Sequence, residues 1–318
     1  MLLVIGGTGF IGSHLLEKLA KSGDRVRALV RRNADLPAGV ESVRGDLLTG
    51  AGLDEALRGV DCVIHLAGVT KALTAADYLK GNAQASGNLA RAAAGRRIRF
   101  VHVSSLAAAG PSLDGVPVDE DVPPHPVSDY GRSKLEGERL VRAAVPDAVV
   151  VRPPVVYGPR DTGVFQVLKS VSRGWALEIG GGERWFSAIF VRDLVDGIIA
   201  AARSSAAPAR TYFLSHAKPV SWAQLSAAAA RIMGRRLRVL RVPLPVAGTV
   251  GVCADLWSRV TRNPGIVSRD KIAEARCMHW TCNPERAASE LGFRAATPLD
   301  AGLAETLGWY KEAGWLKY

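Results

Sequence analysis

The feature that most constrains this chain is a glycine-rich turn that starts at its sixth residue. A short apolar run, residues 2–5, leads into Gly6-Gly7-Thr8-Gly9-Phe10-Ile11-Gly12, and apolar side chains then recur at helical spacing to residue 21. The run predicts a strand buried on both faces, and the spacing predicts an amphipathic helix. Glycine at positions 6, 9 and 12 allows a tight turn, a pyrophosphate against the backbone, and close packing of helix on strand. In this context the turn predicts a dinucleotide-binding site that contains Gly6, Thr8, Gly9, Phe10, Ile11 and Gly12.

Strand and helix patterns alternate along the first half of the chain. We expect further strands at residues 25–30, 60–66, 98–103 and 148–151, and helices at residues 77–94 and 135–144. Strands that alternate with helices of ten or more residues predict a parallel sheet with helices on both faces. The fold class expected is therefore α/β, a doubly wound parallel sheet with a smaller substrate-binding cap.

The pattern becomes looser after Gly158. Asp193 is expected to cap a helix that reaches Ala202, and residues 211–214 could add one more strand to the sheet. We expect residues 1–160 to form the NAD(P)-binding domain. Residues 188–216 are expected to complete the sheet of that domain. Residues 161–318 are expected to form most of the cap, because neither a repeat nor a low-complexity linker separates them from the first half.

The second predicted strand ends in Val30-Arg31-Arg32, where the choice between NAD and NADP is usually made. A site that prefers NAD places an acidic residue here to bind the ribose 2′-hydroxyl, whereas arginine accommodates a 2′-phosphate. Val30 and Arg31 occupy that place, and a guanidinium pairs well with a phosphate dianion. We therefore expect NADP(H) to be preferred, with Arg31 and Arg32 near the phosphate, although Arg32 could equally be a solvated surface charge.

A second motif, Tyr130-Gly131-Arg132-Ser133-Lys134, places a phenol and an ammonium four residues apart on one predicted helix face. A phenol is a poor acid–base catalyst at neutral pH unless its pKa falls, and a nearby ammonium favours the phenolate. We therefore expect Lys134 to lower the pKa of Tyr130. Ser104-Ser105, at the end of a predicted parallel strand, adds a candidate hydroxyl.

The chain resembles the extended short-chain dehydrogenases/reductases, the NAD(P)-dependent epimerase/dehydratase superfamily. Besides the turn and Tyr130 to Lys134, the resemblance rests on Asp46-Leu47, His65-Leu66-Ala67-Gly68, Asn82 with Gly87-Asn88-Leu89, Val103-Ser104-Ser105, and Arg152-Pro153-Pro154-Val155-Val156-Tyr157-Gly158-Pro159. It covers residues 2–159 motif by motif and the rest of the chain more loosely. It implies a Rossmann sheet, an NAD(P)-dependent oxidoreductase and, as a habit of the family, a homodimer.

The same resemblance implies roles for individual residues. Asp46 and Leu47 would flank the adenine, and Leu66, Ala67 and Gly68 would line the ribose and pyrophosphate, with Asn82 also in the cofactor site. Lys134 would hold the nicotinamide ribose, while Pro154, Val155 and Val156 would lie against the nicotinamide. Ser105, which lies 25 residues before Tyr130, would polarise the substrate carbonyl together with Tyr130. Ser105, Tyr130 and Lys134 are thus the expected catalytic residues, and Tyr130 and Lys134 are also expected to contact the cofactor.

Departures from the family pattern point to the substrate. Nucleotide-sugar members usually carry an arginine where this chain has Phe186, while Arg184 lies two residues early. The replacement of this arginine makes the expected substrate pocket less polar. A less polar pocket favours a hydrophobic ketone or alcohol, as in the dihydroflavonol-reductase and 3β-hydroxysteroid-dehydrogenase branches. Residues 242–257 would suit an apolar cap over that pocket, or equally an ordinary core helix. The alternatives are a nucleotide-sugar epimerase/dehydratase and a non-catalytic dinucleotide-binding scaffold protein.

The net charge of +11 requires an anionic partner to be considered. The arginines occur as scattered pairs without interleaved aromatic residues, so we expect no nucleic-acid partner. The longest uncharged stretch, residues 242–254, is too short for stable membrane insertion. Four cysteines are too few for a disulfide framework, and Cys277 to Cys282 supplies too few ligands for a structural metal. We expect a cytoplasmic enzyme without a metal.

Overall fold

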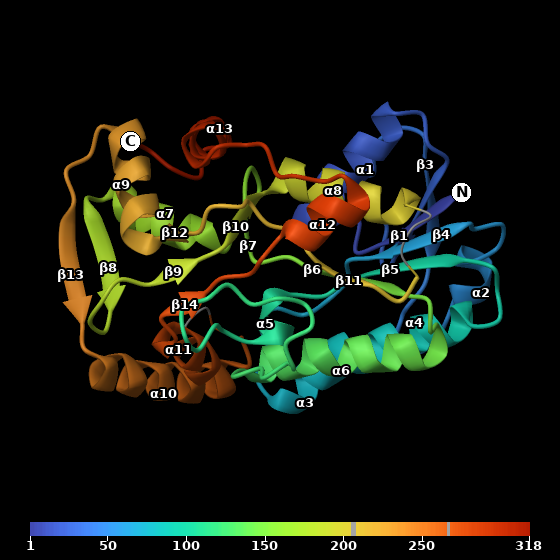
Figure 1. The fold of residues 1–318 in the computed structure, drawn as a ribbon, viewed down its shortest axis with the longest axis horizontal. Coiled ribbons are helices and arrows are strands. Elements are labelled where there is room, and N and C mark those ends of the chain that lie inside the picture. Colours follow the sequence, from blue (N-terminus) through green and yellow to red (C-terminus); the bar gives the residue numbers. More distant parts are fainter. Residues whose placement is uncertain (205–207, 266–267) are drawn as a thin grey trace.

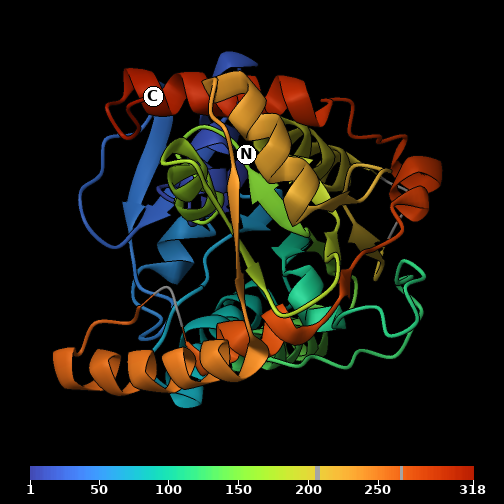
Figure 2. The same ribbon diagram turned by 90° about the vertical axis from the view of Figure 1, so that its left-hand side faces the viewer.

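The computed structural model describes residues 1–204, 208–265 and 268–318, and it contains a helix-covered sheet with a smaller region beside it (Figures 1 and 2). In spatial order, the strands described in this sheet are β11 (Thr211–Phe213), β6 (Val149–Arg152), β5 (Arg99–Val103), β4 (Cys62–His65), β1 (Leu2–Ile5), β2 (Val26–Val30) and β3 (Val40–Arg44). Every neighbouring pair is parallel. The doubly wound parallel sheet is therefore confirmed, and β11 is the additional strand that residues 211–214 predicted.

Side chains of β1 alternate between two apolar cores, because successive residues of a strand point to opposite faces. Val4 packs with α1 (Phe10–Lys21) and α8 (Val191–Arg203), whereas Leu3 and Ile5 pack with α4 (Ala85–Ala93) and α6 (Asp129–Ala144). Figure 1 shows these two pairs of helices on opposite sides of the sheet. The short helices α2 (Leu53–Ala56) and α12 (Glu285–Leu291) complete the two layers. Burial on both faces explains why these strands read as continuous apolar runs.

The edge strand β3 is missing from the sequence-based prediction. Glu41, Ser42 and Arg44 are exposed and Val43 is buried, so the strand lacks the continuous apolar run that marks the others. It forms the edge of the sheet beside β2. An edge position requires less burial than a central one, which explains the weaker signal.

Two helix predictions need correction. The helix expected at residues 77–94 begins as α3 (Ala75–Tyr78), passes through a π-helical turn, η1 (Leu79–Gln84), and continues as α4. The prediction that Asp193 caps its own helix is wrong, because α8 already begins at Val191. The Asp193 carboxylate instead accepts hydrogen bonds from the backbone nitrogen and the hydroxyl of Thr297, at 2.8 and 2.9 Å.

A buried ion pair joins the sheet to α6. The Arg152 side chain at the end of β6 donates two hydrogen bonds to the Glu138 carboxylate, from Nε at 2.9 Å and from Nη2 at 2.6 Å. The two side chains are only 4% and 3% exposed. Each charge therefore depends on the other for its stabilisation within the protein.

The second region holds most of the C-terminal half. Its described elements are α7 (Val164–Ser172), β8 (Trp175–Ile179), β9 (Trp185–Phe186), β12 (Val220–Ser221), α9 (Trp222–Met233), β13 (Arg238–Val242), α10 (Leu244–Thr261), α11 (Arg269–Arg276), β14 (His279–Trp280) and α13 (Leu299–Glu312). The parallel pair β7 (Val155–Tyr157) and β10 (Ala188–Phe190) lies between this cap and the large sheet in Figure 1. A separate apolar core, which includes Phe186, Leu225, Leu303 and Tyr310, holds the cap together.

The alternative of an ordinary core helix at residues 242–257 is wrong. This segment forms most of α10, in which Val246 is 50% and Leu256 is 58% exposed. Leu244 is more covered, because it packs beside Gly180. The large apolar side chains of α10 thus face outward, and they do not fill the core of the cap.

Candidate functional site

The glycine-rich turn joins β1 to α1, and two of its glycines are required by close contacts. Gly6 has a φ of +87°, and a Cβ there would lie 2.6 Å from the backbone nitrogen of Ala67. A Cβ on Gly12 would lie 2.1 Å from the carbonyl oxygen of Gly6. Any larger residue at either position must therefore displace backbone, as the tight turn and the close packing of α1 on β1 require.

The N-terminus of α1 has the properties of a phosphate site. Gly9 precedes the helix, and within the described part of the chain no side chain caps it. Thr8 and Gly9 are exposed, so the first N–H groups of the helix are accessible. Such groups attract a phosphate through hydrogen bonds and through the helix dipole. The turn and the start of α1, including Phe10 and Ile11, therefore fit the pyrophosphate of a dinucleotide.

Arg31 and Arg32 lie at the edge of the sheet that carries this turn. The parallel register places Leu29 of β2 opposite Ile5 of β1, and both arginines are exposed directly after β2. A guanidinium at this edge is accessible to a phosphate on the adenine ribose of a dinucleotide held at the turn. The geometry thus permits the predicted role of Arg31, while the exposure of Arg32 also suits a solvated charge.

Asp46 and Leu47 follow β3 at the same edge of the sheet. The Asp46 carboxylate accepts backbone N–H groups of Leu48 at 2.7 Å and Thr49 at 3.2 Å. The carbonyl oxygen of Leu47 accepts the Asn88 side-chain amide at 2.7 Å. The hydrogen bond from Asn88 fastens the loop to α4, at the edge of the sheet where the adenine is expected.

Asn82 organises the loop that follows β4. Its side-chain oxygen accepts the Val69 N–H at 2.7 Å, and its amide nitrogen donates to the Val69 carbonyl and to the Ser133 hydroxyl at 3.0 and 2.9 Å. These bonds hold the segment of Leu66, Ala67 and Gly68 against α6. Asn82 is 1% exposed and its side-chain amide is fully hydrogen-bonded within the protein, so it supports the loop of the predicted cofactor site from the protein interior.

Lys134 projects from α6 into the same region. Its ammonium donates to the carbonyl oxygen of Val103 at 2.9 Å, and a Cβ on Gly68 would lie 3.5 Å from it. Burial lowers the pKa of Lys134 to about 8, although the nearby Glu138 carboxylate raises it. The amine thus lies between the end of β5 and the Gly68 loop, where the nicotinamide ribose is expected.

Tyr130 and Ser105 come together at the end of β5. Ser105 begins the short helix α5 (Leu106–Ala109), and its hydroxyl accepts the Ala107 N–H at 3.1 Å. Burial raises the pKa of Tyr130, while the charge of Lys271 and a hydrogen bond with the Ser105 side chain lower it. The expectation that Lys134 brings this pKa down needs correction, because burial outweighs the cations and the main opposing charge is that of Lys271. Ser104 is 5% exposed, and its hydroxyl has no hydrogen-bond partner among the described residues.

Helix α11 supplies residues that the sequence analysis missed. The Lys271 ammonium lies 5.3 Å from the centre of the Tyr130 ring and is bonded to Glu274 at 2.8 Å. The Glu274 carboxylate also accepts the Ser128 hydroxyl at 2.7 Å, and the Asp270 carboxylate accepts the backbone N–H groups of Asp129 and Tyr130. Helix α11 is therefore bound to the start of α6. In the sequence, residues 268–276 show only a helix start with alternating charges, which does not identify α6 as the partner.

The segment from Pro154 to Val156 lies next to Ser105. The Pro153 carbonyl accepts the N–H of Leu106 at 2.9 Å, so this segment runs beside the start of α5. Val155 and Val156 then form β7 and are partly exposed. Like Phe10 and Ile11 of α1, they pack against the apolar core of the cap, so the predicted nicotinamide wall and the start of α1 share that core.

Two cap residues that the substrate argument used are already engaged within the chain. Phe186 is 2% exposed and stacks on Trp222 with ring centres 4.2 Å apart. The Arg184 guanidinium donates to the carbonyl oxygens of Ala275, Gly181 and Gly182 at 2.8 to 3.4 Å. In this arrangement Arg184 ties the end of α11 to the Gly180 loop.

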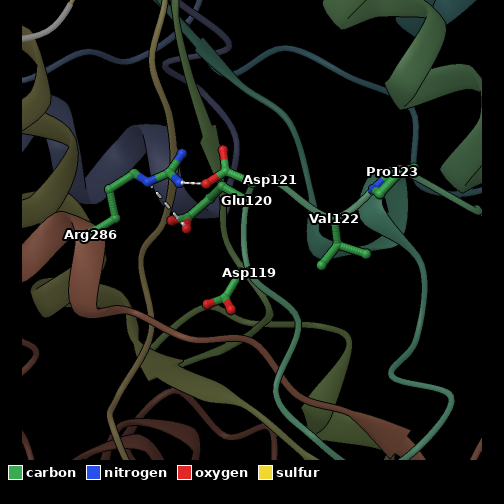
Figure 3. A pocket seen from close by; sticks show the side chains of 6 residues that line it. All are labelled: Asp119, Glu120, Asp121, Val122, Pro123 and Arg286. Carbon is green, nitrogen blue, oxygen red and sulfur yellow. Dashed lines mark hydrogen bonds and ion pairs between the residues drawn. The ribbon is translucent and has the colours of Figure 1, made fainter.

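A hollow lies elsewhere, on the loop before α6 (Figure 3). Asp119, Glu120, Asp121, Val122, Pro123 and Arg286 line it. Arg286 forms ion pairs with Glu120 and Asp121, and Glu120 also accepts the Phe213 N–H at 2.9 Å. The carboxylates therefore serve to fasten this loop to α12 and β11. Across residues 1–204, 208–265 and 268–318, no group of three or more His, Cys, Asp and Glu side chains could hold a metal ion.

Comparison with known proteins extends over both parts of the chain. The model of the NAD dependent epimerase/dehydratase family matches residues 2–214. Ceramide reductase of Caulobacter vibrioides is 34% identical over 317 residues, which cover 98% of this chain and 95% of that protein. The N-acetyl-alpha-D-glucosaminyl-diphospho-ditrans,octacis-undecaprenol 4-epimerase of Escherichia coli O157:H7 is 27% identical over 315 residues, or 96% and 93% of the two chains.

A solved structure is also similar to this chain over nearly its whole length. MoeE5 in complex with UDP-glucose and NAD superposes with a TM-score of 0.80 at 27% identity, over 98% of this chain and 99% of that one. The similar proteins thus include a reductase and epimerase-type enzymes.

Proposed function

The chain belongs to the NAD-dependent epimerase/dehydratase family and is an NAD(P)-dependent enzyme of the short-chain dehydrogenase/reductase type, and from this we propose that it reduces a ketone on a long-chain apolar substrate with NADPH. The observation that carries the proposal is the buried Phe186, stacked on Trp222, where nucleotide-sugar members of the family carry a substrate-binding arginine. Arg184, the nearest alternative, is engaged by backbone carbonyls. Because Phe186 carries no charge and the Arg184 guanidinium is already engaged, this cap offers less to a diphosphate than a cap with a substrate-binding arginine would.

The proposed chemistry uses Ser105 and Tyr130 together. The bound cofactor would supply a hydride to the carbonyl carbon. Tyr130 donates its proton to the carbonyl oxygen, and the Ser105 hydroxyl donates a hydrogen bond to the same oxygen. Because burial raises the pKa of Tyr130, the phenol is protonated at neutral pH and can donate its proton, but the same rise makes it a weaker acid. Lys134 would hold the nicotinamide ribose and so would orient the ring.

Two of the similar proteins support a lipid-like substrate. The printed names of these relatives specify a ceramide and an N-acetylglucosaminyl-diphospho-undecaprenol, which both contain long hydrocarbon chains, although the second relative is an epimerase of a diphosphate-linked sugar. The first of them is a reductase and aligns over nearly the whole chain. We therefore place the substrate of this enzyme among long-chain ketones.

The proposed preference for NADPH predicts the effect of removing one guanidinium. Arg31→Ala is expected to weaken NADPH binding by about ten- to a hundredfold, because a charged hydrogen bond to the 2′-phosphate is worth roughly 1.5–3 kcal/mol. NADH binding should change little. Quenching of tryptophan fluorescence measures both dissociation constants, and Arg97→Ala, which removes an exposed arginine after α4, is the matched control. Equal weakening of NADPH and NADH, or no change in either, would contradict the preference.

A substrate screen tests the proposed reduction itself. NADPH oxidation should be fastest with long-chain ketones, including 3-keto sphingoid or ceramide analogues in detergent, and slower by at least tenfold with short aliphatic ketones. The alternative, a nucleotide-sugar epimerase/dehydratase, is supported by the similarity to the E. coli epimerase and to MoeE5. UDP-sugars and polyprenyl-diphosphate sugars are therefore incubated in parallel and their products analysed, since epimerases regenerate their cofactor. Conversion of sugars without any ketone reduction would replace the proposal by this alternative.

We extend the proposal to the setting of the enzyme. Cys62, Cys253, Cys277 and Cys282 are all free thiols, in keeping with a cytoplasmic location. We also keep the division into a cofactor-binding domain, residues 1–160, and a cap formed mostly by residues 161–318. A homodimer remains part of the proposal, and light scattering at micromolar concentration tests it.

A further inference from the structure

The outer face of α10 carries an apolar stripe that the fold leaves uncovered. We define the stripe as Val246, Thr249, Val250, Cys253, Leu256, Trp257 and Val260. These positions recur at intervals of three and four residues, so they lie on one face of the helix. All of them are exposed, and Trp257 and Val260 reach 70% and 78%.

The residues that the structure describes as buried on the same helix are small. Ala247, Gly251 and Ser258 are buried, and a Cβ on Gly251 would lie 2.9 Å from the Ile272 side chain of α11. A surface helix of a globular protein usually buries its large apolar side chains and exposes polar ones. Helix α10 does the reverse, and an exposed apolar patch of this kind marks an interaction surface.

Exposed arginines surround the stripe. They are Arg241 before the helix, Arg262 after it, and Arg269 and Arg276 on α11. The Arg276 guanidinium approaches α10 at Gly248, where a Cβ would lie 3.7 Å from it. Asp255, an acidic residue on α10, accepts the Arg269 backbone N–H at 3.2 Å and has the Arg269 side chain at 4.0 Å. Arg241 is also paired, with Glu178 at 3.2 Å, so these four arginines and two acids leave the rim with a net positive charge.

We propose that the stripe binds the surface of a bilayer that contains anionic phospholipids, with α10 lying in the headgroup region. An apolar helix face with tryptophan and flanking arginines is suited to this interface, because the apolar side chains enter the acyl boundary and the arginines meet lipid phosphates. A second copy of the chain fits less well, since two stacked stripes would bring positive rims together. Within the described ranges, no helix is long and apolar enough to cross a membrane.

The position of α10 connects this surface to the candidate site. Both views place α10 at an edge of the molecule (Figures 1 and 2), and it packs on α11. Helix α11 in turn holds the start of α6 through Asp270 and Glu274 and places Lys271 against Tyr130. Binding through the stripe would bring the cap and Tyr130 close to the bilayer. This part of the inference rests on the proposed function, because it explains how a long-chain ketone reaches Tyr130.

Vesicle flotation with the full chain tests the proposal without any substrate. The protein should float with vesicles of equal parts phosphatidylcholine and phosphatidylglycerol, and several-fold less with phosphatidylcholine alone or at high salt. Trp257→Asp combined with Val260→Asp should reduce the bound fraction by at least about tenfold, because both side chains would enter the interface. Val246→Asp with Val250→Asp repeats the test at the other end of the helix. Leu113→Asp with Val116→Asp is the matched control on an exposed loop, where Leu113 is 82% exposed, and should leave binding unchanged.

Other outcomes would overturn either this inference or the proposed function, and the measurements distinguish the two. Absence of wild-type binding to the anionic vesicles excludes a membrane surface. A molar mass that falls by half in the Trp257 pair, measured by light scattering, would show that a second copy covers the stripe. Reduction of a detergent-dispersed ketone is measured separately with the same proteins. Turnover without vesicle binding contradicts only this inference, and vesicle binding without turnover of any ketone contradicts only the proposed function. Unchanged melting temperatures establish that the variants are folded.

Discussion

Replacement of Tyr130 by Phe is expected to lower kcat for ketone reduction by at least about a hundredfold and up to about ten-thousandfold, the range for loss of a positioned general acid. The substitution removes the phenol proton and keeps the ring, which packs against Tyr78 at 6.0 Å and lies under the Lys271 ammonium. NADPH binding should therefore remain within about threefold of wild type, because the glycine-rich turn and Arg31 are untouched. The measurements are single-turnover NADPH oxidation and NADPH titration.

Tyr78→Phe is the control for this result. The Tyr78 hydroxyl donates a long hydrogen bond to the Thr70 carbonyl oxygen at 3.4 Å. The variant therefore removes a phenolic hydroxyl from the ring next to Tyr130. We expect its kcat to change by less than about threefold. If Tyr130→Phe kept more than a tenth of the wild-type kcat, Tyr130 would not be the proton donor and a water or another side chain would have to supply the proton.

The second large effect is on stability, and it concerns the Arg152–Glu138 pair. Glu138→Leu is expected to lower the free energy of unfolding by about 3–5 kcal/mol, because it leaves the Arg152 guanidinium buried without a counter-charge. The double variant Glu138→Leu, Arg152→Met should regain most of this loss, since it removes both charges and fills the space with apolar atoms. Urea denaturation in the absence of cofactor measures all three proteins.

A matched ion pair on the same helix provides the control. Arg139 and Glu136 also lie on α6, but both side chains are well exposed, and Arg139 Nη1 lies 3.4 Å from Glu136 Oε2. Glu136→Gln should therefore change the free energy of unfolding by less than about 0.5 kcal/mol. A double variant as unstable as Glu138→Leu alone would mean that the carboxylate stabilises the fold through other contacts. Glu138 also raises the pKa of Lys134, so activity of these variants is not used as a readout.

Local sequence patterns predicted the cofactor half of the molecule well. The turn from Gly6 to Gly12, the helix from residue 10 to 21 and the buried strands all depend on neighbours in the chain or on burial on both faces. The apolar pattern was weaker for the edge strand β3. An edge strand needs less burial, and Glu41 and Ser42 of this strand are exposed. The cap was predicted only in outline, because its short strands pair across long separations, as β13 does with β8.

The sequence by itself determined the parallel sheet, the dinucleotide turn and the presence of Ser105, Tyr130 and Lys134, because each is a short-range pattern tied to one strand or helix. Only the tertiary structure brought Lys271 and Asp270 to Tyr130, more than a hundred residues away, and showed that burial raises the pKa of that phenol. It also decided the direction in which α10 faces. Periodicity identifies an apolar helix face, but packing of the small residues against α11 is what leaves Trp257 and Val260 on the outside. Long-range contacts set both the charge around Tyr130 and the exposure of this stripe, and neither follows from local pattern.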